Sequence, residues 1–207
     1  MVEANGGESV VLTLGPTEAE EQLRDAMALG ADRAIHLVTD GAEWDPQATA
    51  AAIVDAIRED EEGHGHFDLV FFGNESADAG NYQVGIRVAY ALSRPVATGL
   101  KGVLVEDGSV RCEQEFAGGR DVYVLPLPAV VTVLEGLNLP RYPSVPSKLR
   151  AQRKPLHSRG PDRPPAELEM TRLIVPEGQG TEAVILGEGP AAAPAVVEVL
   201  RQIGVVS

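Results

Sequence analysis

The sequence predicts an α/β protein: a mostly parallel sheet covered by helices, followed by a β-meander and an extended C-terminal arm. Hydrophobic residues make up 44 % of the chain but aromatics only 4 %, so the core consists of Val, Leu, Ile and Ala. Such a core suits parallel strands under alanine-rich helices. Apolar runs alternate with helical patterns up to Leu92, and from Val96 the hydrophobic period changes to two, as in antiparallel strands.

The first elements form a βαβ unit. Ser9–Leu14 is an apolar run that ends in a Gly-Pro turn, which is typical of a buried strand. Thr17 is predicted to cap the next helix, with Glu20 completing a capping box. Gly30 ends this helix, and Ala34–Val38 is the second strand.

A second unit of the same kind follows. Asp45 precedes a proline and is predicted to cap a helix that runs to Arg58. The acidic, glycine-containing segment 59–66 is predicted as a loop, and Phe67–Phe72 as the third strand. After a polar loop, residues 81–92 are predicted as a helix with one apolar face.

The rest of the chain divides into a meander, one more buried strand and an arm. The predicted strands are 100–106, 109–116, 121–125 and 129–134. Beyond Leu156 the segment 157–165 is rich in proline, and the last helix is predicted at 191–203. We therefore expect an α/β domain over residues 1–156 and a C-terminal arm over 157–207, whose apolar helix packs on a partner subunit.

Charge and composition exclude several classes of function. The formal net charge is −14, which disfavours nucleic acid as the main partner because duplex binding requires phosphate neutralisation. Cys112 is the only cysteine, so nothing indicates an oxidising compartment. No signal peptide and no run of about 18 apolar residues is present, and the composition favours a cytoplasmic protein.

The loop Gly73–Gly85 is the best candidate for a binding site. It follows the carboxyl end of a strand and enters a helix N-terminus, where open α/β sheets bind ligands. Free N–H groups and close-approaching glycines suit a phosphate, and Asp78 suits a ribose hydroxyl or a metal. Neither a GxGxxG nor a GxxxxGK[ST] motif is present. An ordinary βα loop explains the same residues equally well.

No constellation for bond-making catalysis or for a tetrahedral metal site is apparent. His64 and His66 lie in an acidic segment without a third ligand. Serine, histidine and Cys112 show no nucleophile context, so we predict no catalytic residue and no metal. This pattern favours a binding or carrier role.

The segment Val130–Leu156 combines a buried strand with a proline-stiffened basic stretch. Pro140, Pro143 and Pro146 are predicted to hold the backbone extended and to display Val145 beside cationic residues. An apolar side chain among cations suits docking to a protein partner. A solvated loop and helix is the alternative.

This segment, VVTVLEGLNLPRYPSVPSKLRAQRKPL, resembles the strand, N-x-P-R-[YF] motif and basic helix of electron-transfer flavoprotein β subunits, the FixA-like family. Three further blocks resemble the same family in the same order: VVLTLGPTEAEEQLRDAMALGADRAIHL (Val10–Leu37), DLVFFGNESADAGNYQVG (Asp68–Gly85) and LPAVVTV (Leu127–Val133). Together they cover residues 5–156. The C-terminal arm resembles the family only in being a proline-rich extension that ends in a short helix. Met1–Glu8 resembles the tail of the family's first helix, so we expect the family's N-terminal strand and most of that helix to be lacking.

The resemblance implies a Rossmann-like domain that pairs with an α subunit. The α subunit holds most of the FAD contacts, and the β subunit carries a structural AMP, or a second FAD in electron-bifurcating members. By position, the nucleotide site comprises Leu14, Gly73, Asn74, Glu75, Ser76, Ala77, Asp78, Asn81, Gln83, Val84 and Gly85.

The resemblance also implies docking to acyl-CoA dehydrogenases and other redox partners. The docking residues are Tyr142, Pro143, Val145, Pro146, Lys148 and Leu149. Val145 stands in the place of an exposed leucine of the family. The expected function is that of an electron carrier subunit; the alternatives are a stand-alone adenine-nucleotide-binding regulatory module without flavin and an enzyme acting on an adenylated substrate.

Overall fold

A computed structural model describes residues 2–139, 141–162, 171–172, 174–175 and 183–206. The chain forms two compact units, Met1–Glu169 and Met170–Ser207, and each is described by itself. Among the described residues, no helix is long and apolar enough to cross a membrane.

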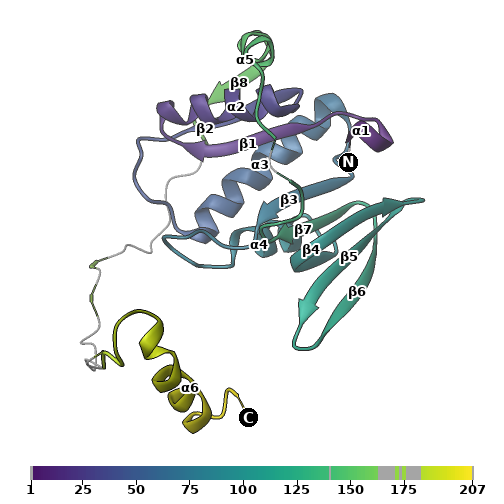
Figure 1. Ribbon diagram of the computed structural model, residues 1–207. Coiled ribbons are helices and arrows are strands. Elements are labelled where there is room, and N and C mark those ends of the chain that lie inside the picture. Colours follow the sequence, from purple (N-terminus) through teal and green to yellow (C-terminus); the bar gives the residue numbers. More distant parts are fainter. Residues whose placement is uncertain (1, 140, 163–170, 173, 176–182, 207) are drawn as a thin grey trace. The chain divides into compact units, whose positions relative to one another are not determined.

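The first unit contains two sheets (Figure 1). One is fully parallel, in the order β1 (Val10–Gly15), β2 (Arg33–Val38) and β8 (Leu156–Arg159). β1 and β2 join through α2 (Glu20–Leu29), which confirms the predicted βαβ unit. Strand β8 shows that residues 157–159, assigned to the arm by sequence, belong to this sheet.

The second sheet is mixed, in the order β3 (Leu69–Gly73), β7 (Ala129–Val133), β4 (Val96–Glu106), β5 (Ser109–Phe116) and β6 (Gly119–Pro126). β3, β7 and β4 are parallel, whereas β4, β5 and β6 form the predicted antiparallel meander. Its core is aliphatic, with Leu100, Val110 and Val131 fully buried. The predicted α/β class with a meander is confirmed.

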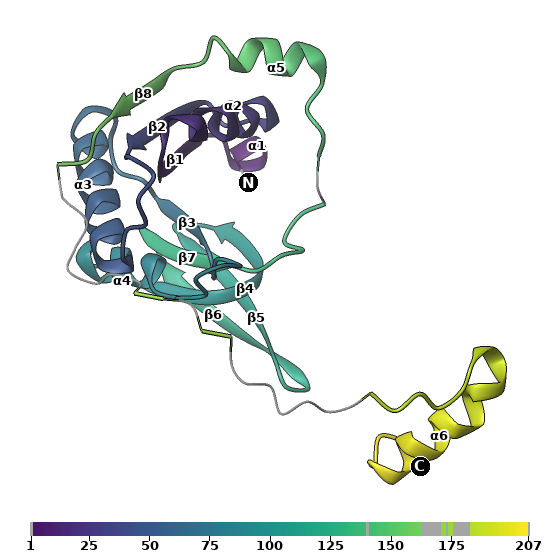
Figure 2. The same ribbon diagram turned by 90° about the vertical axis from the view of Figure 1, so that its left-hand side faces the viewer.

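Helix α3 (Pro46–His64) packs on both sheets (Figure 2). Its Ala52 and Ala56 contact the first sheet, while Ile53 and Val54 contact apolar side chains of β3. The remaining helices of this unit are α1 (Val2–Asn5), the 3₁₀ turn η1 (Thr17–Ala19), α4 (Val84–Ala91) and α5 (Val145–Ala151). The Asp45 cap is confirmed, because its Oδ1 accepts from the N–H groups of Gln47 (2.7 Å) and Ala48 (2.9 Å).

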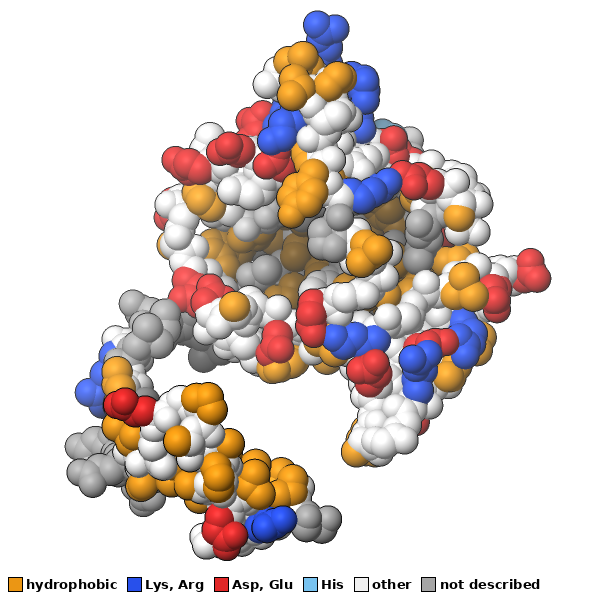
Figure 3. All heavy atoms as spheres, viewed as in Figure 1, with side chains coloured by type: hydrophobic (Ala, Val, Ile, Leu, Met, Phe, Trp, Pro, Cys, Tyr) orange, Lys and Arg blue, Asp and Glu red, His pale blue; other side chains and the backbone are white. Residues whose placement is uncertain are grey.

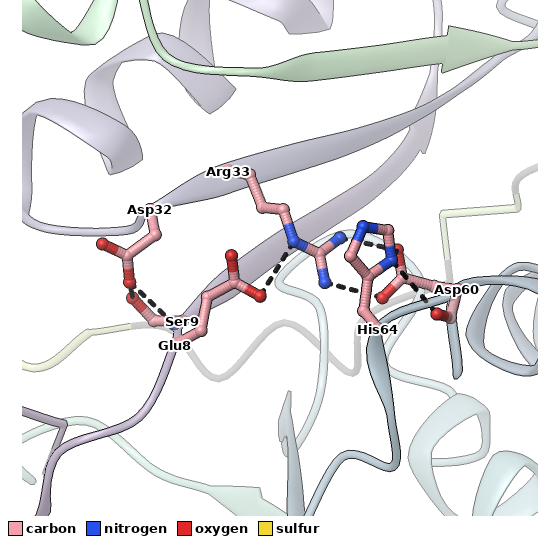
Figure 4. Close-up of polar contacts among 6 residues, drawn as sticks. All are labelled: Glu8, Ser9, Asp32, Arg33, Asp60 and His64. Atoms are coloured by element: carbon pink, nitrogen blue, oxygen red, sulfur yellow. Dashed lines mark hydrogen bonds and ion pairs between the residues drawn. The ribbon is translucent and has the colours of Figure 1, made fainter. Parts of the chain in front are cut away.

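The predicted loop at 59–66 is wrong, because α3 continues to His64. Two acidic residues in this segment are nearly buried and bind distant arginines. Asp60 accepts two hydrogen bonds from Arg33, at 2.6 and 2.7 Å, and Glu61 pairs with Arg94. Figure 4 shows Arg33 reaching Asp60 from the start of β2, with Glu8 on its other side. These ion pairs join the last turns of α3 to the sheets.

Two predicted helix starts are also wrong. Thr17 lies in η1, and α2 begins at Glu20 without a side-chain cap, so no capping box forms. The helix predicted from residue 81 begins at Val84, because Tyr82 adopts a left-handed backbone with φ of 55° that cannot continue a helix. Gly30 does end α2, with φ of 141°.

The second unit consists, among its described residues, of η2 (Gly189–Ala192) and α6 (Ala193–Gln202). The predicted C-terminal helix is therefore confirmed. It has no buried residue within the structure. Much of the predicted arm, residues 163–170, 173 and 176–182, lies outside the described residues.

Candidate functional site

The loop between β3 and α4 is fixed at its start by Asn74. The Asn74 N–H donates to the carbonyl of Val133 (3.0 Å), and its Oδ1 accepts from the Thr132 hydroxyl (2.7 Å). The Thr132 hydroxyl in turn accepts from the N–H of Gly99 (3.0 Å). The buried Thr132 side chain therefore links the carboxyl ends of β3 and β7 to Gly99, where the pairing of β4 with β7 shifts its register. This places the loop at the edge of the sheet where parallel strands bind ligands.

The N-terminus of α4 faces this loop without a side-chain cap. Gln83 occupies the cap position, but its Oε1 accepts from the Arg87 guanidinium at 3.1 and 2.9 Å instead. The first turn of α4 therefore keeps its positive dipole end, and Arg87 adds a cation within one turn. Such a helix start can bind an anion.

Two acidic side chains lie on the loop itself. Asp78 is exposed, and its pKa is lowered by hydrogen bonds from the Ser76 hydroxyl and the N–H of Ala79, the latter at 2.7 Å. Glu75 raises the pKa of the half-exposed Tyr82, because its carboxylate favours the protonated phenol. Asp78 thus stays ionised in a fixed position and can accept hydrogen bonds from hydroxyl groups.

The predicted nucleotide residues fall into two groups. Leu14, Val84 and Gly85 are packed: Leu14 contacts the cluster of Leu37 and Trp44, and Gly85 is buried against the sheet. A Cβ at Gly85 would lie 2.9 Å from Thr132 Cγ2, so this glycine permits the close approach of α4 to β7. The others, apart from the half-buried Asn74, are exposed along the loop: Gly73, Glu75, Ser76, Ala77, Asp78, Asn81 and Gln83. Nucleotide contacts of all of them stay predictions.

Sequence reasoning missed Thr132 and Arg87. A threonine inside the otherwise apolar run AVVTV was the signal for the first, since a buried hydroxyl must find hydrogen-bond partners. For Arg87 the signal was its position four residues after Gln83, because side chains with this spacing are neighbours on a helix.

The predicted docking residues gather at the start of α5. Tyr142, Val145 and Leu149 are 94 %, 74 % and 59 % exposed, and we call these three side chains the docking surface. Pro146 and Lys148 are exposed beside it, and Pro143 is half-buried. Figure 3 shows basic and hydrophobic side chains together at this protruding end of the unit.

The expectation that Val145 lies in an extended loop is wrong, because Val145 is the first residue of α5. The Ser144 hydroxyl caps the helix by accepting from the N–H of Ser147 (3.3 Å). A proline in the first turn lacks only an N–H that the helix does not use, so Pro146 supports the helix start. Val145 is therefore displayed from a helix N-terminus.

Comparison with known proteins matches residues 1–162 to the electron transfer flavoprotein domain. The chain is 36 % identical over 151 residues to the electron transfer flavoprotein subunit beta of Thermoanaerobacterium thermosaccharolyticum, covering 72 % of this chain and 56 % of that protein. It is 34 % identical over 155 residues to the Bacillus subtilis subunit beta, covering 74 % and 59 %. It is 40 % identical over 154 residues to protein FixA of Sinorhizobium fredii, covering 72 % and 54 %.

The matches thus span little more than half the length of these curated relatives. They cover the two sheets, the loop before α4 and the docking surface. The sequence blocks, the α/β fold and these matches agree, and the chain belongs to the electron transfer flavoprotein family, in its β subunit and FixA branch.

Proposed function

We propose that this chain is the β half of a heterodimeric electron carrier and binds an adenine nucleotide on the loop before α4. The observation that supports this most is the uncapped N-terminus of α4 with Arg87 beside it, at the carboxyl ends of parallel strands. The proposal includes the cytoplasmic location expected from the sequence.

The residues of the loop fit AMP, or the AMP half of a second FAD. A phosphate would lie at the first turn of α4, with Asn81 as a side-chain donor. The ribose hydroxyls would donate to Asp78, whose ionised carboxylate is already oriented by the loop. Because the phosphate and Asp78 are both negative, we assign the phosphate to the end of the loop that enters α4 and the ribose to Asp78, in the middle of the loop.

The redox-active FAD would be held mainly by an α subunit, and when bound it supplies the uptake and release of electrons. This chain would contribute scaffolding, the structural nucleotide and the docking surface. Tyr142, Val145 and Leu149 would enter an apolar pocket of an acyl-CoA dehydrogenase-type partner, with Lys148 at the rim. The chain itself would catalyse no bond-making step.

Helix α6 is the proposed anchor on the α subunit. Val196, Val199 and Ile203 follow helical spacing and are 41 %, 36 % and 65 % exposed, so one apolar face lacks cover within its own unit. A partner subunit that buries this face would gain about 25 cal/mol for each Å² of apolar surface.

Co-expression with a cognate electron-transfer flavoprotein α subunit tests the proposal. We expect a yellow 1:1 heterodimer in native mass spectrometry, with FAD and one AMP released on denaturation and identified by chromatography. Val199→Asp, on the apolar face of α6, should prevent assembly. The matched change Val124→Asp, at an exposed position on β6, should not.

A heterodimer without flavin would overturn the carrier function. Tight AMP binding by the isolated chain, without flavin or partner, would instead favour the stand-alone nucleotide-binding module. A flavin heterodimer that releases neither AMP nor a second FAD would remove the nucleotide part of the proposal only.

A further inference from the structure

Strand β4 departs from the regular pleat at the level where the loop before α4 begins. Its register with β7 shifts between Ala97 and Leu100, and Gly99 inside this step has a left-handed backbone with φ of 64°. Leu100 pairs with Val133, which in turn pairs with Gly73, the last residue of β3. The irregular part of β4 therefore lies at the carboxyl edge of the sheet, beside the candidate site. Such irregularities are common next to functional sites.

The peptide unit that joins Thr98 to Gly99 is held by two side chains, one from each neighbouring strand. The Thr98 carbonyl accepts from Nε2 of Gln114 on β5 (3.1 Å). The Gly99 N–H donates to the hydroxyl of Thr132 on β7 (3.0 Å). Because a trans peptide unit is planar, its C=O and N–H point in opposite directions and turn together. The contact with Gln114 therefore sets the direction of the Gly99 N–H.

Gly99 lies between Gln114 and the first residue of the loop, Asn74. A Cβ at Gly99 would lie 3.2 Å from Gln114 Nε2 and 3.8 Å from Asn74 Oδ1. The Thr132 hydroxyl accepts from the Gly99 N–H and donates to Asn74 Oδ1 (2.7 Å). A hydroxyl has one proton, so a donor at its lone pair helps to direct that proton to Asn74. The Gly99 N–H thus orients the hydroxyl that holds the start of the loop.

The amide of Gln114 is oriented by Tyr123 of β6. The Tyr123 hydroxyl donates to Gln114 Oε1 (3.3 Å), which leaves Nε2 directed at the Thr98 carbonyl. With the amide reversed, Oε1 would face the carbonyl oxygen, and this contact would be lost. Glutamine suits the position because its side chain donates and accepts at once, whereas an ionised glutamate only accepts.

These contacts cross the whole second sheet, whose strands lie in the order β3, β7, β4, β5 and β6 (Figure 1). Each strand or its adjoining loop contributes one member: Asn74, Thr132, the Thr98–Gly99 peptide, Gln114 and Tyr123. A chain of contacts carries coupling only where the loss of one member changes the next. Gln114 is the member to change, because it is the only one that contacts the peptide from β5 by a side chain within the described residues.

We propose that Gln114 is a positioning residue of the candidate site. It holds the Thr98–Gly99 peptide so that Thr132 keeps Asn74, and with it the loop before α4, in the conformation that binds the nucleotide. Gln114 acts through Thr132 and Asn74 and not by touching the nucleotide. The effect on nucleotide affinity rests on the proposed function, whereas the hold on Asn74 does not.

Amide hydrogen exchange, measured by NMR on the full chain, tests the hold on the loop. In Gln114→Glu the carboxylate cannot donate to the Thr98 carbonyl, so we expect the amides of Gly99 and Asn74 to exchange at least about tenfold faster. Gln114→Arg keeps a donor and should retain slow exchange at both amides. The amide of Val110, a fully buried residue on the same strand, should stay protected in both variants and thus report an intact fold.

Titration of the nucleotide-free heterodimer with AMP tests the consequence for the site. We expect Gln114→Glu to weaken AMP binding about fivefold, and Gln114→Arg to bind like the natural protein. Gln152→Glu, the same change at an exposed residue just after α5, is the matched control and should leave the affinity unchanged.

Unchanged exchange of Gly99 and Asn74 in Gln114→Glu would overturn the proposal. Equal exchange rates in Gln114→Glu and Gln114→Arg would do so too, because the donor would then not matter. Faster exchange with unchanged AMP affinity would show that the site does not depend on this anchor, which also overturns it. If the natural heterodimer binds no AMP, the nucleotide part of the proposed function fails, and the exchange of Asn74 alone decides whether Gln114 holds the loop.

Discussion

Arg24 of α2 binds backbone carbonyls at the carboxyl end of α5, and Lys154, just after α5, binds backbone carbonyls at the carboxyl end of α2. Arg24 donates to the carbonyls of Ala151 (3.0 Å) and Lys154 (2.9 Å). The Lys154 ammonium donates to the carbonyls of Met27 (3.0 Å) and Ala31 (2.6 Å). Cations at helix C-termini satisfy unpaired carbonyls and oppose the helix dipole. This exchange holds α5, and with it the docking surface, on α2.

We expect Arg24→Met and Lys154→Met each to lower the free energy of unfolding by about 1–2 kcal/mol, because each removes two charge-assisted hydrogen bonds from half-buried carbonyls. Since both join the same helix pair, the double variant should differ from the sum of the single variants. Urea denaturation of the four proteins measures this. Strict additivity would show that the two residues act independently.

Val145→Asp should abolish docking without harming the fold. An aspartate at the start of α5 is favourable for the helix dipole, whereas its charge cannot enter an apolar pocket. In the heterodimer we expect electron transfer to an acyl-CoA dehydrogenase to fall at least about tenfold with the flavin spectrum intact. Val124→Asp, the same change at an exposed position on β6, is the control. Unchanged transfer with Val145→Asp would contradict the assignment of the docking surface.

Local sequence patterns predicted strands β1 to β7, the meander and the Asp45 cap, but not β8, because the signals for the former lie within a few neighbouring residues. The end of α3 was missed because Asp60 and Glu61 are stabilised by Arg33 and Arg94, which are 27 and 33 residues away. An acidic segment is easily predicted as a loop when the arginines that pair with it are distant in the sequence. The start of α4 was missed because the backbone of Tyr82 is left-handed, which side-chain periodicity does not report.

The sequence predicted where the candidate site lies in the chain, but not which residues hold its loop in place. The run 73–85 was identified from its place after a strand, yet its anchor, Thr132, comes from another strand. The division into two sheets was missed entirely, because strand order depends on long-range pairing rather than on local pattern.

The free energy of unfolding should depend on pH through Glu61. Burial raises the pKa of its carboxyl group, but hydrogen bonds from Arg94, the Phe67 N–H and His66 together lower it below the usual 4.5. Because the pKa is lower in the folded state, Glu61 contributes fully to the free energy of unfolding above about pH 4.5. This contribution is lost as the pH falls through the pKa of the folded state.

Glu61→Gln should therefore cost about 3 kcal/mol at pH 7, because the nearly buried Arg94 guanidinium loses the carboxylate that neutralises its charge. The difference from the natural protein should shrink as the pH falls from about 4.5 through the lowered pKa of folded Glu61, because the carboxylate is protonated first in the unfolded chain and then in the folded one. Thermal unfolding at a series of pH values measures both. Glu62→Gln, the same change at the exposed neighbouring residue, should show neither effect.

Arg87→Gln should weaken nucleotide binding about tenfold, because it removes the cation beside the first turn of α4. Arg150→Gln, on the exposed face of α5, is the matched control. Calorimetry with AMP on the heterodimer stripped of nucleotide measures the affinity. Equal affinities of the two variants would argue against a phosphate at this helix start.

Gly85→Ala and Gly63→Ala should have opposite effects although both glycines lie in helices. At Gly85 a Cβ would lie 2.9 Å from Thr132 Cγ2 and 3.1 Å from Phe72 Cβ, so α4 must move away from the sheet, at a cost of about 1–3 kcal/mol. At Gly63, near the end of α3, a Cβ meets nothing within 4 Å, and alanine should stabilise the helix by about 0.5 kcal/mol. Because Thr132 also holds Asn74, Gly85→Ala should displace the loop and lower AMP affinity, whereas Gly63→Ala should leave it unchanged. Denaturation and AMP titration of both variants decide this, and equal stability of Gly85→Ala and the natural protein would show that the contact of α4 with β7 is looser than the structure describes.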